Sequence, residues 1–207
     1  MAEKKKSCFY ENDLPEGLDL GNEVAIDTEA MGLNNFRDRL CLIQISSGDG
    51  TSYIVRFQPK KYNAPNLKKV LRDNKILKIM HFARFDMAIL QKNLGVKLKN
   101  VYCTKIASKI ARTYTDAHGL KALVKEVIGI NLNKQEQTSY WGAEKISCEQ
   151  LEYAAHDVLY LHQLKKALDE QLEREGRKQL AYDTFKCLNA RVDLDLAGWL
   201  EVDIFSH

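Results

Sequence analysis

Residues 23–56 read EVAIDTEAMGLNNFRDRLCLIQISSGDGTSYIVR and contain three short runs rich in aliphatic and β-branched residues. The runs cover residues 23–28, 40–46 and 51–56, and the SGDG turn between the last two predicts a β-hairpin. One strand followed by a hairpin gives three strands within a short length of chain. This stretch therefore predicts a sheet that begins near the N-terminus.

Helical patterns dominate the chain after this sheet-forming stretch. Strands that come first and helices that follow indicate an α/β fold, in which a mixed central sheet is covered by helices. The periodicity predicts a strand over 76–80 and helices from about 66, over 82–94, 104–112 and 119–129, from 147 to about 168, and over 176–190, before an irregular tail.

The composition is that of an ordinary globular chain. With 207 residues, 45% of them hydrophobic, the chain fits one mid-sized domain. No apolar run approaches the roughly 18 residues of a membrane helix, so we expect no membrane association. The five cysteines are scattered and include no Cys-x-x-Cys pair, which argues against disulfides and cysteine zinc sites. We therefore expect a cytoplasmic protein.

Charge is unevenly distributed along the chain. Residues 56–125 carry seventeen Lys and Arg but only three Asp and Glu, whereas the segments on either side are net acidic. A block this basic predicts a positive surface that attracts polyanions such as nucleic acid, although solvated lysines would leave the same pattern. The three acids inside the block are rare there: Asp73, Asp86 and Asp116.

Four acidic residues and a tyrosine stand where they could meet at one edge of the predicted sheet. Asp27 and Glu29 end the first strand, and their spacing of two places both carboxylates on one face. Asp86 lies early in a helix that leaves a strand, and Tyr153 lies one turn before Asp157 on a late helix. Carboxylate oxygens without a Cys or His set favour Mg²⁺ or Mn²⁺ over zinc.

Each part of this pattern is common by itself. An Asp-x-Glu pair is usually a surface charge, and Tyr153 alone would be interpreted as a packing aromatic. The ordered combination is more specific, because an acid pair ends a buried strand, a third acid follows another strand, and a Tyr/Asp pair sits on a late helix. Together these residues predict a divalent-metal site.

Three segments carry a family resemblance: residues 25–33 (AIDTEAMGL), 81–86 (HFARFD) and 151–157 (LEYAAHD). They resemble the three exonuclease motifs of the DEDD superfamily, and the tyrosine four residues before the last Asp is typical of its DEDDy branch, which includes ribonuclease D. The similarity runs over nearly the full chain. Within this ribonuclease D-like group, details such as residues 38–41 and 203–205 look most like the compact nanoRNase C type.

This resemblance implies a ribonuclease H-like exonuclease fold and a hydrolase that degrades RNA in the 3′→5′ direction and releases 5′-mononucleotides. It also implies activity on RNA as short as dinucleotides and a ring-shaped homo-octamer. The exonuclease domain would cover residues 1–175, and residues 176–207 would add a helix and tail to the same domain. Because so little chain follows the third motif, we expect short oligomers rather than long structured RNA as substrates.

The resemblance also assigns roles to the acids and the tyrosine. Asp27, Glu29 and Asp157 would hold one divalent cation, which lowers the pKa of its bound water, and Asp27 would reach a second cation with Asp86 in its shell. Tyr153 is a poor base at neutral pH because the reference pKa of tyrosine is about 10. We expect its hydroxyl to hydrogen-bond and aim the attacking water.

Further residues are expected to contact the substrate. Thr28 lies between the first two acids, and Leu33 resembles the apolar wedge that separates the last two bases in short-RNA exonucleases. His81 is expected near the substrate sugar or phosphate, with a buried structural histidine as the alternative. Four residues fall in segments where this family could meet the 5′ phosphate of a dinucleotide: Arg112, His118, Lys134 and Gln135.

Two features remain with open alternatives. Trp141 is interpreted as a core or interface residue rather than a base-stacking platform. The apolar and acidic tail from Arg191 to His207 predicts either docking on a neighbouring subunit or packing on its own domain.

We therefore predict a metal-dependent 3′-5′ exoribonuclease that finishes RNA decay by hydrolysing very short oligonucleotides. The main alternative is a broader ribonuclease D-like exonuclease that trims RNA 3′ ends or degrades DNA, since no residue here can be shown to read a 2′-hydroxyl. A non-catalytic nucleic-acid-binding module is a further alternative. Such a module would be expected to lack one of the four acids, and this chain has all four.

Overall fold

A six-stranded mixed sheet forms the centre of the structure, a computed structural model that describes residues 6–132 and 139–206. The strand order is β1-β4-β3-β2-β5-β6. The β2–β3 and β3–β4 pairs are antiparallel and the other three pairs are parallel, so the expected mixed sheet and hairpin are confirmed. The strands are β1 (Lys6–Glu11), β2 (Glu23–Ala30), β3 (Leu40–Ser46), β4 (Thr51–Arg56), β5 (Leu77–Met80) and β6 (Val101–Cys103).

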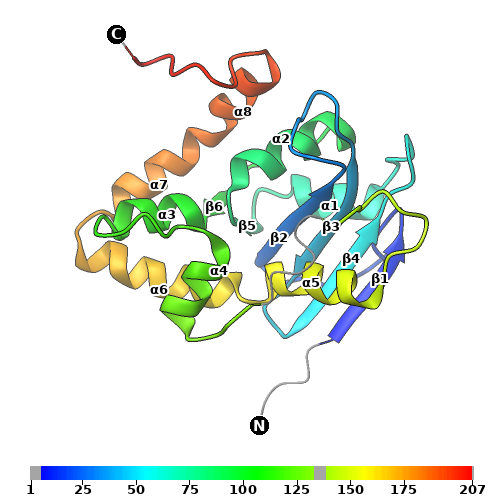
Figure 1. Cartoon of the computed structure of the whole chain (residues 1–207), viewed down its shortest axis with the longest axis horizontal. Helices are drawn as coiled ribbons and strands as arrows, with labels where there is room; N and C mark the ends of the chain where they lie inside the picture. Colours follow the sequence, from blue (N-terminus) through cyan, green and yellow to red (C-terminus); the bar gives the residue numbers. More distant parts are fainter. Residues whose placement is uncertain (1–5, 133–138, 207) are drawn as a thin grey trace.

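Helices cover the sheet on both faces. In Figure 1, α5 (yellow) lies over the face turned to the viewer, whereas α1 and α2 lie behind the sheet, and α3, α6 and α7 stack beyond β6. The helices are α1 (Pro65–Arg72), α2 (Ala83–Leu94), α3 (Thr104–Ala111), α4 (Leu120–Leu123), the π-helix η1 (Val124–Ile128), α5 (Cys148–Leu159), α6 (Leu161–Arg174), α7 (Lys178–Lys186) and α8 (Leu188–Leu196).

The hydrophobic core has two parts because the sheet separates them. The larger cluster includes buried residues of β2, β3 and β5 together with α1, α2, α3 and α6. The smaller cluster lies under α5, where Leu42 and Ile54 of the sheet pack with Trp141, Ala154 and Ala155. α5 begins with the expected capping box, in which the Ser147 hydroxyl accepts a 3.2 Å hydrogen bond from the Gln150 backbone N–H.

Several elements differ from the sequence prediction. The edge strands β1 and β6 were not expected, because β1 is largely exposed and β6 has only three residues, so neither shows a clear apolar pattern. The helix expected from 147 to about 168 is divided at Tyr160. Here α5 packs on the sheet and α6 packs on α3, and one straight helix could not bury both faces. The last helix is divided at Cys187, and helical structure continues to Leu196 instead of ending near residue 190.

The C-terminal arm, α7, α8 and the segment after it, packs on the same body as the sheet. The buried carboxylate of Asp195 on α8 accepts hydrogen bonds from Arg84 Nε on α2 (2.5 Å) and Arg191 Nε (2.9 Å). Arg84 Nη2 also donates to the Leu200 carbonyl at 2.7 Å, and Arg191 Nη1 donates to the Val202 carbonyl at 3.1 Å. The tail as far as Val202 is therefore tied to its own domain.

All five cysteines are free thiols in the structure. Among the described residues, no helix combines the length and apolar character needed to cross a bilayer. The cytoplasmic location stays a prediction, since neither observation tests the compartment.

Candidate active site

The predicted acids come from three separate elements that meet at one end of the sheet. Asp27 and Glu29 lie near the end of β2, just before a register shift between Glu29 and Ala30 in the pairing with β3. Asp86 lies in the first turn of α2, where the positive end of the helix favours a carboxylate. Asp157 lies on α5, one turn after Tyr153.

All five residues line one cavity of about 700 Å³. One carboxylate oxygen from each of Asp27, Glu29 and Asp157 can be chosen so that all three lie within 4.8 Å of one another. Three oxygens this close, with no Cys or His in the group, form a donor set that suits a hard divalent cation such as Mg²⁺ or Mn²⁺. The expected convergence of the acids is therefore observed, whereas their catalytic roles stay predictions.

The acids strongly perturb one another. Burial and then the neighbouring carboxylates raise the pKa of Asp27 and Glu29 well above their ordinary values. Burial raises the pKa of Asp86 to about 7, and it raises the pKa of Asp157 to about 7 against the opposing charge of Lys121. A nearby positive charge favours the ionised form of such carboxylates, so binding a cation would relieve their mutual repulsion.

Tyr153 is held by packing on one side and by charge on the other. Its ring lies 6.1 Å from the Trp141 ring, centroid to centroid, and the Lys121 ammonium lies 5.2 Å from its ring centroid. Burial and then the negative charge of Asp157 raise the pKa of Tyr153, so the hydroxyl stays protonated at neutral pH. A protonated hydroxyl beside Asp157 can orient water but cannot act as a base. Trp141 is buried, as expected, and contributes to the cavity wall.

Two residues expected to contact the substrate line the cavity and make internal contacts there. The Thr28 hydroxyl donates a 2.6 Å hydrogen bond to Asp86 Oδ1. His81 Nδ1 lies 2.9 Å from Thr104 Oγ1, and burial followed by the charge of Lys105 lowers the pKa of His81 to about 3. His81 is therefore neutral at physiological pH, which fits the alternative of a structural histidine that also borders the cavity.

Leu33 projects from a tightly bonded loop between β2 and β3 and is 86% exposed, although it lines the cavity. The Asp38 carboxylate accepts a 2.9 Å hydrogen bond from the Asn34 backbone N–H and a 2.7 Å hydrogen bond from Arg37 Nε. A Cβ atom on Gly32 would lie 2.4 Å from Asp38 Oδ2, so any larger residue there would have to displace this carboxylate or shift the loop. The loop thus holds an apolar side chain in solvent at the mouth of an acidic cavity.

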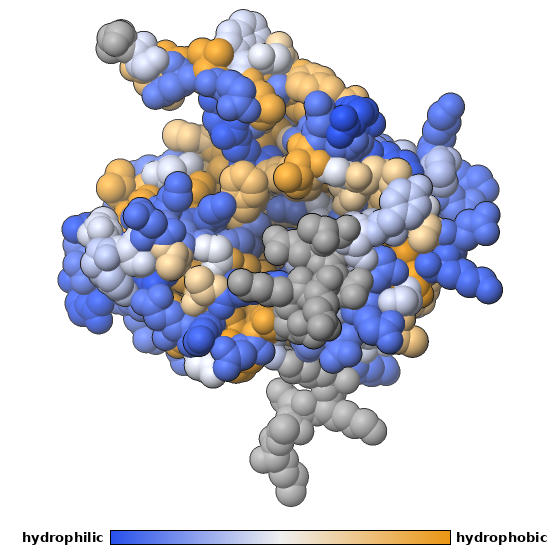
Figure 2. All heavy atoms as spheres, in the orientation of Figure 1, coloured by the Kyte–Doolittle hydropathy of each residue, from blue (hydrophilic) through white to orange (hydrophobic). Residues whose placement is uncertain are grey.

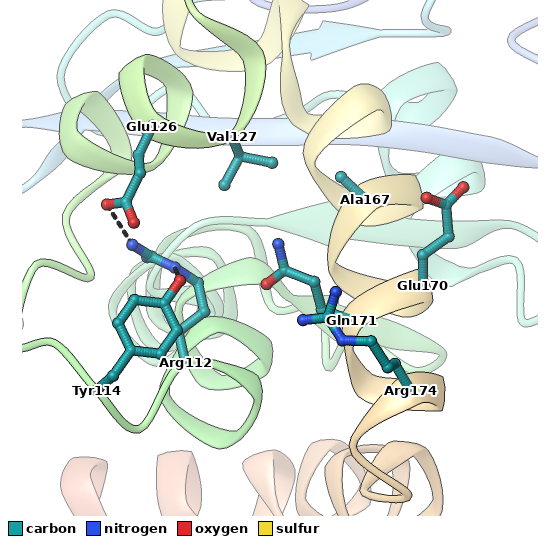
Figure 3. Close-up of a pocket in the computed structure, with 8 residues that line it drawn as sticks. All are labelled: Arg112, Tyr114, Glu126, Val127, Ala167, Glu170, Gln171 and Arg174. Carbon is teal, nitrogen blue, oxygen red and sulfur yellow. Dashed lines mark hydrogen bonds and ion pairs between the residues drawn. The ribbon is translucent and has the colours of Figure 1, made fainter.

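Arg112 lies apart from the acids, in a smaller cavity of about 300 Å³. Its side chain is only 1% exposed and pairs with Glu126 of η1, facing Gln171 and Arg174 of α6 across the cavity (Figure 3). Arg112 Nη1 also donates hydrogen bonds to Ser108 Oγ (3.0 Å) and to the Ala117 carbonyl (3.2 Å). This geometry supports the loop that precedes α4, and it gives Arg112 no contact with the acid-lined cavity.

His118 ends the same loop. Its Nδ1 lies 2.8 Å from Ser108 Oγ, and burial followed by the charges of Arg112 and Lys109 lowers its pKa. His118 does not line the acid-lined cavity, although Gly119 directly after it does. Substrate contacts of Arg112 and His118 therefore stay predictions, and Lys134 and Gln135 lie outside the described residues.

The sequence interpretation missed four residues around the acids. Phe82, Lys105 and Lys121 line the cavity. In the sequence, Phe82 looks like an apolar residue at the start of a helix, and the two lysines lie in a lysine-rich block, so none of the three stands out as a site residue. Gln44 pairs in register with Asp27, so it shares its face of the sheet. Its amide is buried and has no hydrogen-bond partner among the described residues. A polar residue in the apolar run of β3 was the available signal for Gln44.

Comparisons with known proteins are consistent across sequence and structure. The sequence profile of a 3′-5′ exonuclease family matches residues 5–173. Ribonuclease D of Granulibacter bethesdensis is 30% identical over 166 residues, which are 80% of this chain and 42% of that protein. This chain therefore spans about two fifths of the length of that relative.

Solved structures extend the similarity to nearly the whole chain. The structure of Brucella melitensis NrnC bound to pGG is 51% identical, with a TM-score of 0.93, and the match covers 99% of this chain and 100% of that one. The structure of Brucella melitensis NrnC with bound Mg²⁺ is 50% identical, with a TM-score of 0.91, and the match covers 98% of this chain and 99% of that one.

Proposed function

The chain belongs to the 3′-5′ exonuclease family and has its ribonuclease H-like fold, and we propose that it hydrolyses very short RNA, down to dinucleotides, to mononucleotides. The observation that carries this proposal is the cavity in which Asp27, Glu29 and Asp157 gather their carboxylates beside Tyr153. The similarity to Brucella melitensis NrnC, which binds pGG, supports a short substrate.

The donor set supports a divalent cation as the cofactor. Three carboxylates with raised pKa values and mutually close oxygens fit Mg²⁺, the ion bound to Brucella melitensis NrnC, and Mn²⁺ would suit the same donors. We further propose that Asp27 and Asp86 would hold a second ion, because both carboxylates line the same cavity. Such ions supply Lewis-acid stabilisation of negative charge during phosphodiester hydrolysis.

Three further residues would position the reacting groups rather than bind the metal. Tyr153 keeps its proton, and we propose that its hydroxyl orients the attacking water for in-line displacement at the phosphorus. Thr28 fixes one oxygen of Asp86 with its 2.6 Å hydrogen bond. Leu33 supplies an exposed apolar surface at the cavity mouth, where it would separate two bases of a short RNA.

A length series tests this function. Purified protein is incubated with 5′-labelled RNAs of two to twenty nucleotides, with Mg²⁺ or with EDTA, and products are resolved over time. We expect stepwise loss from the 3′ end, strong preference for the dinucleotide and no reaction in EDTA. Equal or faster digestion of the longest RNA would favour the broader ribonuclease D-like exonuclease, and a parallel DNA series would measure the sugar preference.

A matched pair of variants controls the assay. Asp27→Asn removes one carboxylate from the acid-lined cavity, whereas Asp73→Asn removes an exposed carboxylate outside it. Activity should be lost in the first variant and retained in the second. Full activity of Asp27→Asn would contradict the proposed site.

We also propose that the chain assembles with copies of itself, and the resemblance to nanoRNase C implies eight copies in a ring. Hydrophobic residues are exposed on the C-terminal arm, which projects at the top of Figure 2. They include Trp199, Leu200, Ile204 and Phe205. Light scattering of the wild type and of a Phe205→Ser variant would test this, since a single-chain mass for the wild type would contradict it.

A further inference from the structure

Phe82 is an exposed aromatic residue in a strained backbone conformation at the edge of the acid-lined cavity. Its backbone is left-handed, with φ 61° and ψ 41°, and the residue is 47% exposed. Bulky residues rarely adopt this conformation, and such strain tends to persist where a ligand site depends on it. Within the described residues, Phe82 belongs to neither hydrophobic cluster, so packing in the core does not account for it.

The Phe82 ring makes a cation–π contact with a lysine side chain. Lys105 Nζ, in the first turn of α3, lies 4.2 Å from the Phe82 ring centroid, which is close for a cation–π contact. Both residues line the cavity that contains the acids. An aromatic face and an ammonium group therefore stand together beside the predicted metal ligands.

The cavity thus presents apolar surface from two loops. Leu33 comes from the loop after β2 and Phe82 from the turn between β5 and α2, and both side chains are exposed although both border the acids. In a short RNA, the bases are the flat apolar parts and the phosphate carries the charge. A site that hydrolyses such a molecule needs apolar surfaces for bases next to oxygen ligands and a cation for phosphate.

We propose that Phe82 is a stacking platform for one nucleobase of the substrate, and that Lys105 fixes the ring and attracts the adjacent phosphate. This inference rests on the proposed function, because it names how that site holds a short RNA. Stacking on an aromatic ring accepts any base, so Phe82 would give affinity without sequence preference. It would also make the enzyme discriminate against a sugar-phosphate that lacks a base.

Binding measurements test the proposal directly. The affinity for pGG is measured by calorimetry with Ca²⁺ in place of Mg²⁺, and stacking is followed by the fluorescence of a 2-aminopurine dinucleotide. Phe82→Ala should weaken binding about 5- to 150-fold, the effect typical of losing one stacked base, and should relieve the fluorescence quenching. Phe82→Trp should bind at least as tightly as the wild type.

Two further variants separate binding from folding. Phe82→Gly removes the ring and the backbone strain together, so its melting temperature should equal or exceed that of the wild type while pGG binding is weakened as in Phe82→Ala. Phe9→Ala is the matched control, because Phe9 is 39% exposed on β1 beneath the Arg56 guanidinium (5.8 Å to the ring centroid) and lies outside the cavity. It should bind pGG like the wild type.

The outcomes distinguish this inference from the proposed function. If the wild type hydrolyses pGG and Phe82→Gly binds it equally well, the stacking platform is wrong and the function stands. If the wild type does not hydrolyse short RNA at all, the proposed function is wrong. Weaker pGG binding in Phe82→Gly with unchanged binding of an abasic dinucleotide supports the platform.

Discussion

The Thr28 hydroxyl donates a 2.6 Å hydrogen bond to Asp86 Oδ1 and so connects the end of β2 to the first turn of α2. The two residues are 58 positions apart in the sequence. The bond favours the charged form of Asp86, and so it opposes the burial that raises the pKa of this carboxyl to about 7. Thr28 therefore positions an acid of the site and helps it to ionise.

Replacing Thr28 by Val removes this hydroxyl at nearly constant volume. The pKa of Asp86 should rise further, and the acid limb of the pH–rate profile should move to higher pH. Loss of a hydrogen bond that orients a metal ligand typically costs about 10- to 100-fold in metal affinity or activity. Calorimetric titration with Mn²⁺ and the pH dependence of kcat/KM measure both effects. Thr28→Ser keeps the hydroxyl and should behave like the wild type; equal metal affinity in Thr28→Val would rule out this role.

Tyr153→Phe should lose turnover while keeping metal and substrate affinity. The ring still packs against Trp141, so the fold should be retained, but the hydroxyl beside Asp157 is gone. Misorientation of the attacking water should lower kcat about 100-fold or more. Single-turnover rates on pGG would measure this loss. Tyr140→Phe is the control, since Tyr140 is 64% exposed and does not line the cavity, and unchanged turnover in Tyr153→Phe would remove the hydroxyl from the mechanism.

The convergence of the four acids could be predicted from the sequence because regular secondary structure determines which side chains share a face. A spacing of two on β2 and of four on α5 determines which side chains share a face, and strand ends gather at a sheet edge. The hairpin and most helix positions followed from turn residues and apolar periodicity. The edge strands did not, because β1 gains its pairing from β4, which is distant in the sequence.

The residues around the acids could not be predicted because their positions depend on tertiary structure. Lys105 and Lys121 lie in a lysine-rich block. The sequence does not distinguish them from solvated lysines, and only the folded structure shows that they line the cavity. The pairing of Arg112 with Glu126 in the smaller cavity likewise depends on tertiary structure, and the substrate contact expected of Arg112 stays a prediction. The left-handed backbone of Phe82 has no sequence signal, since a bulky residue is the least expected there.

The stability of the metal-free protein should fall as pH rises. Burial raises the pKa of Asp86 and Asp157 to about 7, above the value of about 3.9 expected when unfolded, so the folded state binds more protons between these values. The stabilisation by these groups is complete below the unfolded pKa and is lost as pH increases through the folded pKa. In EDTA, we therefore expect a lower free energy of unfolding at pH 8 than at pH 5.

Asp157→Asn isolates this effect. The variant removes one repelling carboxylate, so without metal it should be more stable than the wild type at pH 8, on the order of 1 to 3 kcal/mol, and the difference should shrink by pH 5. The lowered pKa of His81 changes stability with pH in the opposite direction. Because His81 is present in both proteins, its contribution cancels in the difference between their free energies of unfolding. Urea unfolding at the two pH values gives the comparison. A wild-type protein that is the more stable of the two at pH 8 in EDTA would contradict the assigned charge repulsion.

Gly32→Ala should weaken substrate binding through the position of Leu33. The new Cβ would lie 2.4 Å from Asp38 Oδ2, and this carboxylate cannot yield freely because the Asn34 N–H and Arg37 hold it. The loop must shift and carry Leu33 with it, so KM for a dinucleotide should rise at least several-fold while kcat changes less. Gly119→Ala serves as the control, since Gly119 lines the same cavity but a Cβ there meets no atom within 4 Å. If Gly32→Ala keeps the wild-type KM, the position of this loop does not determine dinucleotide affinity.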